Sequence, residues 1–181
     1  LRREGMAGER AKRRSKRQAL AGLPANWRIA LCKRAVGGRY LFSLIVLALT
    51  GCRPSELVHG IDIWRGKDEV TGKLLIHLRI RGAKVKDSQG QPLRTISYDT
   101  NDPHPLVVVV NELLDTQSEP RVFAQVRSAV NLTVEIRRLA RSLWPKHKQP
   151  ITSYCFRHQF AADLKANGDD EATSRGLGHI S

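Results

Sequence analysis

The spacing of apolar positions along this 181-residue chain changes twice, from a helical period to an alternating one and back. Residues 24–35 have the amphipathic spacing of a helix, and residues 39–50 are apolar enough to form a mostly buried helix. Two glycines separate these segments. After a corner at residues 51–53, residues 54–59 are predicted to form a short helix that completes this part of the chain.

The middle of the chain has the alternation that is typical of strands. Residues 74–80 are rich in branched side chains and alternate with polar ones, and residues 61–64 and 94–98 have a similar pattern. The polar stretch 84–90 lies between two of these segments and predicts a hairpin tip. Together they predict a small antiparallel sheet.

The C-terminal part returns to helical spacing. Residues 106–115 are β-branched and are expected to be helical, although a strand is possible. A further helix is predicted to begin at Thr152 or Ser153, either of which can cap it. Between them, residues 122–143 carry apolar side chains at helical spacing, namely Val126, Val130, Val134, Ile136, Leu139 and Leu143. The predicted fold class is mainly α-helical with a small antiparallel β-sheet.

The charge balance points to a polyanionic partner. The net charge is +14 and the sequence pI is about 10.4. An anionic membrane is a weaker alternative, because the longest apolar run, residues 41–49, is too short to span a bilayer. Cys32, Cys52 and Cys155 are widely separated, which fits reduced thiols in a cytoplasmic protein better than a disulfide framework or a zinc site.

The N-terminal segment is strongly basic. Residues 1–18 carry eight Lys or Arg and two Glu, a net charge of +6. We predict that residues 1–19 are a poorly ordered linker whose Arg13 and Arg14 contact DNA phosphates, and that the folded domain spans residues 20–181. Because the chain opens on Leu1 rather than Met, it is expected to be a piece of a longer protein.

The corner at residues 49–57 is the first candidate for chemistry. Gly51 can adopt the left-handed conformation that ends a helix, and Pro54 suits the first turn of the next. Glu56 in that turn favours the helix N-terminus. Arg53 therefore lies beside unpaired backbone N–H groups, where a phosphate is favoured. The alternative is an ordinary corner with a solvated arginine.

A second candidate lies in the last predicted helix, where Tyr154 and Arg157 share one face. Two arginines, a hairpin lysine and one or two histidines on separate elements make a sensible phosphoryl-transfer site. Since the sequence shows no carboxylate cluster for a metal, Arg and Lys would neutralise the transition state without cofactors. The simpler interpretation of Lys84 and Lys86 is that they are solvated hairpin-tip residues.

Several stretches together resemble the tyrosine recombinases, the phage-integrase family. Residues 48–57, Ala-Leu-Thr-Gly-Cys-Arg-Pro-Ser-Glu-Leu, resemble the first box of the family, and residues 152–160 resemble the second. Residues 177–181 resemble the Leu-Gly-His-Ser that follows the second box, and residues 82–86 resemble the hairpin that carries the family's lysine. The resemblance runs in the right order from about residue 20 to the end, and its motifs are specific in combination rather than singly.

The resemblance implies metal-free exchange of DNA strands through a 3′-phosphotyrosyl link. Arg53 and Arg157 would clamp the non-bridging oxygens of the scissile phosphate, where planar guanidinium groups are not replaceable by lysine. Lys84 would protonate the leaving oxygen, with Lys86 as the alternative.

Further roles follow from the same resemblance. Glu56 would support Arg53, His179 would hydrogen-bond the phosphate, and His158 would lie behind the catalytic groups. Lys86 and Arg94 complete the predicted DNA contacts.

Two departures from the family pattern qualify the expected activity. Tyr154 stands where histidine is usual, and a phenol with a pKa of about 10 is a poor base near neutral pH. The family's nucleophilic tyrosine lies beyond His179, so it is expected past Ser181. The 181 residues are therefore expected to bind duplex DNA as a monomer without cleaving it, whereas the intact parent would act as a tetramer.

Three alternatives remain open at the level of sequence. A non-catalytic DNA-binding protein could reuse the fold, and a type IB topoisomerase-like enzyme would share the strand chemistry. A basic RNA-binding domain is less well supported, because only 6% of the residues are aromatic.

Overall fold

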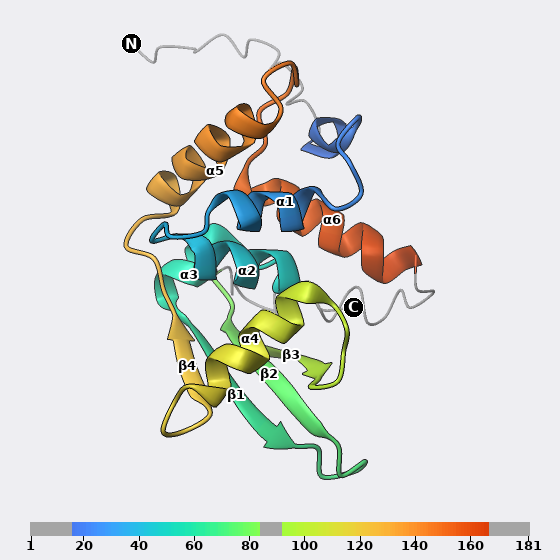
Figure 1. The fold of residues 1–181 in the computed structure, drawn as a ribbon, viewed down its shortest axis with the longest axis vertical. Helices are drawn as coiled ribbons and strands as arrows, with labels where there is room; N and C mark the ends of the chain where they lie inside the picture. Colours follow the sequence, from blue (N-terminus) through green and yellow to red (C-terminus); the bar gives the residue numbers. More distant parts are fainter. Residues whose placement is uncertain (1–15, 84–91, 167–181) are drawn as a thin grey trace, which may run out of the picture.

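The computed structural model describes residues 16–83 and 92–166, and Figure 1 shows most of the helices gathered above one end of a twisted sheet. Four short helices come first along the chain: the 3-10 helix η1 (Lys16–Leu20), α1 (Trp27–Arg34), α2 (Leu41–Thr50) and α3 (Pro54–His59). These bounds confirm the two predicted helices before the corner and the short helix after it. The carbonyl oxygen of the buried Ala19 lies 2.9 Å from His147 Nε2, so residues just before position 20 also pack into the fold.

The sheet has four antiparallel strands in the order β3-β2-β1-β4. Its register places Ile63 of β1 between Leu78 of β2 and Val122 of β4. Alternate residues of the central strands, including Ile61, Ile63, Ile76, Leu78 and Ile80, point into the core, as the alternating pattern predicted. The strands are β1 (Ile61–Lys67), β2 (Leu74–Arg81), β3 (Leu93–Asp99) and β4 (Arg121–Ala124).

The fourth strand corrects the sequence prediction. Residues 122–124 were expected to begin a long helix, but they pair with β1, and α5 (Ala129–Leu143) starts only after Ser128. The Ser128 hydroxyl accepts a hydrogen bond from the Asn131 N–H at 3.2 Å and caps the helix. A strand of four residues is too short to show alternation clearly, so the period of the following helix was extended over it.

The buried face of α5 also differs from the predicted stripe. Val130 and Val134 are exposed, and the residues that face the core are Leu132, Ile136 and Leu139. Val126, which is buried, lies before the helix. Ile136 and Leu139 of the predicted stripe are therefore confirmed, whereas Val130 and Val134 lie on a different side of the helix from these two residues.

The segment that could have been helix or strand is a helix, α4 (Pro105–Asp115). Pro105 occupies its first turn, and His104 Nδ1 accepts a hydrogen bond from the Leu106 N–H at 3.2 Å. Its buried residues Val107, Val110 and Leu114 fall at helical spacing and join the core. Tertiary packing of one apolar face therefore outweighs the low helix propensity of valine.

The hydrophobic core centres on α2, in which eight of ten residues are buried. Helix α6 (Ser153–Ala166) crosses it, and Phe156 of α6 meets Trp27 of α1 edge to face, with ring centroids 4.8 Å apart. The Tyr98 hydroxyl of β3 donates to the Leu49 carbonyl at the end of α2. These contacts bring the α2–α3 corner, β3 and α6 to one place. In the described ranges, no helix has the length and apolar character needed to cross a bilayer.

Candidate functional site

The corner between α2 and α3 is shaped by Gly51, which has the left-handed backbone that was predicted, with φ of 55°. A Cβ at this position would lie 2.7 Å from the Phe160 Cβ, so glycine is required by both the backbone and the close approach of α6. Pro54 then begins α3. The turn fixes Arg53 between two helices and directs its side chain toward the body of the protein.

Glu56 is the centre of the site. Its side chain is fully buried, and its carboxylate accepts from the Arg53 backbone N–H at 2.7 Å and from Arg53 Nη1 at 2.9 Å. The same carboxylate accepts from Arg94 Nη1 at 3.1 Å and Nη2 at 2.7 Å, so Arg94 binds it with both ends of its planar group. Both carboxylate oxygens are therefore shared between the two arginines.

The electrostatics of Glu56 follow from this geometry. Burial alone raises the pKa of a carboxyl, but the hydrogen bonds and charge of Arg94, together with those of Arg53, outweigh burial and hold the pKa of Glu56 below its ordinary value. Glu56 is ionised at neutral pH, as a buried acid must be if it is to anchor two guanidinium groups.

The position of Arg94 does not fit the expectation that it contacts DNA. Only 3% of its side chain is exposed, and it points from β3 into the protein toward Glu56. A signal was present in the alternation of β3, since Arg94 shares one side of the strand with Ile96 and Tyr98, which pack against the core. An arginine in a basic chain was nevertheless expected at the surface. Arg94 is a structural partner of Glu56.

Arg157 reaches the same corner from α6. Its Nη1 donates to the Gly51 carbonyl oxygen at 3.2 Å. Burial and the nearby positive charge of Arg53 lower the pKa of Arg157 to about 10, which still leaves it charged at neutral pH. The two arginines, 104 positions apart in sequence, therefore reach the same corner, Arg157 through the Gly51 carbonyl and Arg53 through the Glu56 carboxylate.

The four residues Arg53, Glu56, Arg94 and Arg157 carry three positive charges and one negative charge, a net charge of +2. Arg53 is mostly buried, with 15% of its side chain exposed, so the alternative of a solvated arginine at an ordinary corner does not describe it. Two converging guanidinium groups in a partly buried, net positive site are suited to an anion with several oxygens.

Two further predicted residues lie on α6. Tyr154 is exposed in its first turn and His158 is exposed one turn later. The start of the helix is tied to α5, because the hydroxyls of Ser153 and Thr133 lie 2.9 Å apart. Lys84, Lys86, His179, Arg13 and Arg14 lie outside the described residues, so their predicted roles stay predictions.

The exposed side of α5 and the short segments before and after it carry a basic surface that was not predicted to be functional. Six cations lie exposed between residues 127 and 148, and Glu135 is the one acidic residue of that span. Glu135 binds Arg138 with distances of 2.7 and 2.8 Å. The signal was present, since arginines fill the polar face of the predicted helix. We call these cations the α5 basic surface: Arg127, Arg137, Arg138, Arg141, Lys146 and Lys148.

The three cysteines, Cys32, Cys52 and Cys155, are free and buried, as expected for reduced thiols. Among residues 16–83 and 92–166, no three His, Cys, Asp or Glu side chains are grouped closely enough to hold a metal ion.

No protein-family model matches this sequence, and no curated protein sequence matches it either. The fold does match solved structures of XerH site-specific recombinase bound to its difH substrate. The pre-cleavage complex has a TM-score of 0.52 and 14% sequence identity, over 88% of this chain and 47% of that one. The post-cleavage complex with palindromic difH has the same score and identity, over 46% of its chain. This chain therefore shares its fold with a site-specific recombinase, over about half the length of that protein.

Proposed function

We propose that this chain is the DNA-cleaving and rejoining domain of a tyrosine recombinase. The observation that carries the proposal is the convergence of Arg53 and Arg157 on the Gly51–Glu56 corner, with Arg157 Nη1 3.2 Å from the Gly51 oxygen. The motif resemblance and the shared fold both support this function.

In the proposed reaction, a tyrosine hydroxyl attacks a backbone phosphate, a 3′-phosphotyrosyl bond forms and the 5′-oxygen leaves as a hydroxyl. Arg53 and Arg157 hold the non-bridging oxygens and stabilise the charge that develops on them. Lys84, or else Lys86, gives the leaving oxygen its proton, and His179 donates a hydrogen bond to the phosphate. No metal takes part.

Glu56 and Arg94 act on this reaction through Arg53. Two hydrogen bonds to the buried carboxylate fix the Arg53 backbone and side chain before substrate arrives, and two from Arg94 hold that carboxylate in place. A guanidinium that is already oriented loses little freedom when a phosphate binds, which is the advantage of a preorganised site.

The proposed partner is duplex DNA. The related structures hold a recombinase on its DNA substrate. The α5 basic surface supplies cations at the density that phosphate contacts require, and such contacts position a duplex without reading its sequence. We place the nucleophilic tyrosine C-terminal to His179, and we propose that the protein acts as a tetramer on DNA.

The test uses the protein with its nucleophilic tyrosine and a nicked duplex that traps the covalent intermediate. A protein–DNA adduct that is lost in Arg53→Ala and in Arg157→Ala, while Arg34→Ala on the exposed end of α1 retains it, would support the proposal. An adduct that survives both substitutions would reject it. DNA binding with no adduct under any condition would favour a non-catalytic DNA-binding protein, for which the exposed Tyr154 in place of histidine is the supporting observation.

A further inference from the structure

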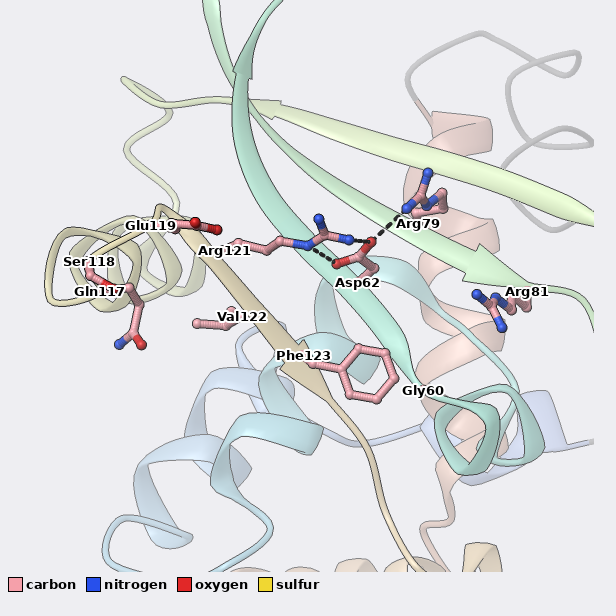
Figure 2. Close-up of a pocket in the computed structure, with 10 residues that line it drawn as sticks. All are labelled: Gly60, Asp62, Arg79, Arg81, Gln117, Ser118, Glu119, Arg121, Val122 and Phe123. Carbon is pink, nitrogen blue, oxygen red and sulfur yellow. Dashed lines mark hydrogen bonds and ion pairs between the residues drawn. The ribbon is translucent and has the colours of Figure 1, made fainter.

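The two faces of the sheet differ in what covers them. Helix α4 packs on the inner face, where Arg65 Nη2 of β1 donates to the Asn111 carbonyl at 2.9 Å. On the outer face no described element covers β1, β2 and β4, and a groove of about 510 Å³ lies there. Figure 2 shows this outer-sheet groove, which is lined by Asp62, Arg79, Arg81, Glu119, Arg121 and Phe123.

Asp62 fixes two arginines within the groove. Arg121 binds it through Nε at 2.8 Å and Nη2 at 2.6 Å, and Arg79 Nη2 approaches from the other side at 2.7 Å. Arg79 also lies over the ring of Trp64, 5.0 Å from its centroid. Arg79 and Arg121 each have further N–H groups that do not bind Asp62. The contacts with Asp62 hold these groups in fixed directions along the groove.

Arg81 and Phe123 give the groove a cation and an apolar contact. Arg81 is exposed at the end of β2, and no ion pair joins it to any residue in the described ranges. Phe123 is 58% exposed. Its ring lies against the backbone of Gly60, where an added Cβ would come within 2.0 Å of Cζ. The groove therefore offers an apolar ring and a cation to the same ligand.

The edge strand adds backbone groups to the same site. The Arg65 N–H donates to the Pro120 oxygen at 3.0 Å, so in the antiparallel ladder Val122 and Ala124 also direct their backbone groups toward β1. Phe123 lies between these positions and directs its N–H and C=O toward the open edge. An extended peptide can add to such an edge.

Charge decides which class of partner fits. The groove has three arginines against Asp62 and Glu119, a net charge of +1. A nucleic-acid strand would bring one phosphate after another past both carboxylates, whereas the α5 basic surface offers it six cations against one acid. A peptide with an occasional carboxylate and an apolar side chain matches one cation, one ring and a free strand edge.

We propose that the outer-sheet groove binds an acidic, partly apolar peptide segment of a partner protein. The peptide lies along β4, places an apolar side chain on Phe123 and places a carboxylate on Arg81. The paired arginines on Asp62 supply further donors. This inference does not depend on the proposed DNA chemistry, because it involves none of the residues of the arginine site.

The test is an NMR titration of the ¹⁵N-labelled 181-residue chain with a synthetic eight-residue peptide of alternating glutamate and leucine. We expect saturable shifts in β1, β2 and β4, and affinity that falls about fivefold to tenfold in Arg81→Glu, since reversal of one contact charge replaces an attraction by a repulsion. Phe123→Ser should weaken binding by a similar factor. Arg34→Glu, which makes the same charge change on α1, should leave the affinity unchanged.

Three results would overturn the proposal. The first is the absence of shifts in the groove up to millimolar peptide. The second is an equal response to a peptide with lysine in place of each glutamate, which would show that charge does not select the ligand. The third is a 20-base-pair duplex that shifts the same groove resonances and displaces the peptide, which would assign the groove to nucleic acid. Failure of the DNA-cleavage test would leave all three readouts unaffected.

Discussion

Replacement of Arg94 by methionine separates a structural role for this residue from a DNA contact. In the structure, Arg94 donates to both oxygens of Glu56 at 2.7 and 3.1 Å with 3% of its side chain exposed. Methionine keeps much of the apolar length of the side chain but removes both charge-assisted hydrogen bonds. The buried carboxylate of Glu56 then loses Arg94 and keeps Arg53.

The expected cost follows from the burial of the pair. Removal of one partner of a buried ion pair destabilises a protein by about 3 to 5 kcal/mol. Because Arg53 still compensates the charge of Glu56, we expect the lower end, about 3 kcal/mol. For a domain of this size each kcal/mol lowers the melting temperature by about 2 to 4 °C, which gives a decrease of about 6 to 12 °C.

The assay is thermal and urea unfolding of the 181-residue chain, followed by circular dichroism. Arg81→Met is the matched control, since it changes an exposed arginine on the neighbouring strand and should cost less than about 0.5 kcal/mol. The double variant Glu56→Gln/Arg94→Met should cost clearly less than the sum of the two single changes, because both remove the same interaction. A decrease for Arg94→Met no larger than that of Arg81→Met, together with weaker DNA binding, would refute the reasoning.

Three further predictions follow from the same region. Gly51→Ala should destabilise the chain by more than Gly72→Ala in urea unfolding. Both residues have positive φ, but of the two only Gly51 would bring its new Cβ against a neighbour, Phe160, at 2.7 Å. Equal costs for the two substitutions would contradict the close packing at Gly51. The pKa of Glu56 is lower in the folded state, so its ionised form stabilises the fold; this stabilisation is complete above the ordinary carboxyl pKa of 4.5 and is lost as the pH falls through the lower folded-state pKa. The difference in unfolding free energy between the native chain and Glu56→Gln should therefore shrink in acid, and a constant difference would contradict this. Burial raises the pKa of the Cys52 thiol to about 12, so it should react with a thiol reagent at pH 8 only after denaturation, and fast labelling of the native chain would show that it is not buried.

The elements that were predicted correctly are those whose own residues decide them. Gly51 and Pro54 fix a left-handed turn and a helix start through local backbone chemistry, so the corner could be placed without knowledge of the rest of the fold. The apolar run before it is long enough to identify a buried helix. The approach of Arg157 to this corner was inferred from motif resemblance, since nothing local relates positions 104 residues apart.

The features that were missed depend on tertiary contacts. Strand β4 has four residues and its hydrogen-bond partners are in β1, so its own sequence has almost no pattern that predicts a strand. Arg94 lies on the inward side of β3 with Ile96 and Tyr98, but its partner Glu56 is 38 positions away and is brought to it only by the fold. An arginine in a basic chain is expected at the surface, and only the position of Glu56 shows why this one is inside.

The most direct test of the central claim follows the side-chain Nε–H signals of Arg53 and Arg157 by NMR in the arginine-labelled chain during titration with a short duplex of random sequence. If the two guanidinium groups hold one phosphate, both signals shift together with a common affinity, and Arg53→Lys abolishes the shift of Arg157, while the Nε–H of Arg34 does not move. A titration in which only arginines of the α5 basic surface respond, and the signals of Arg53 and Arg157 stay in place, would contradict the account.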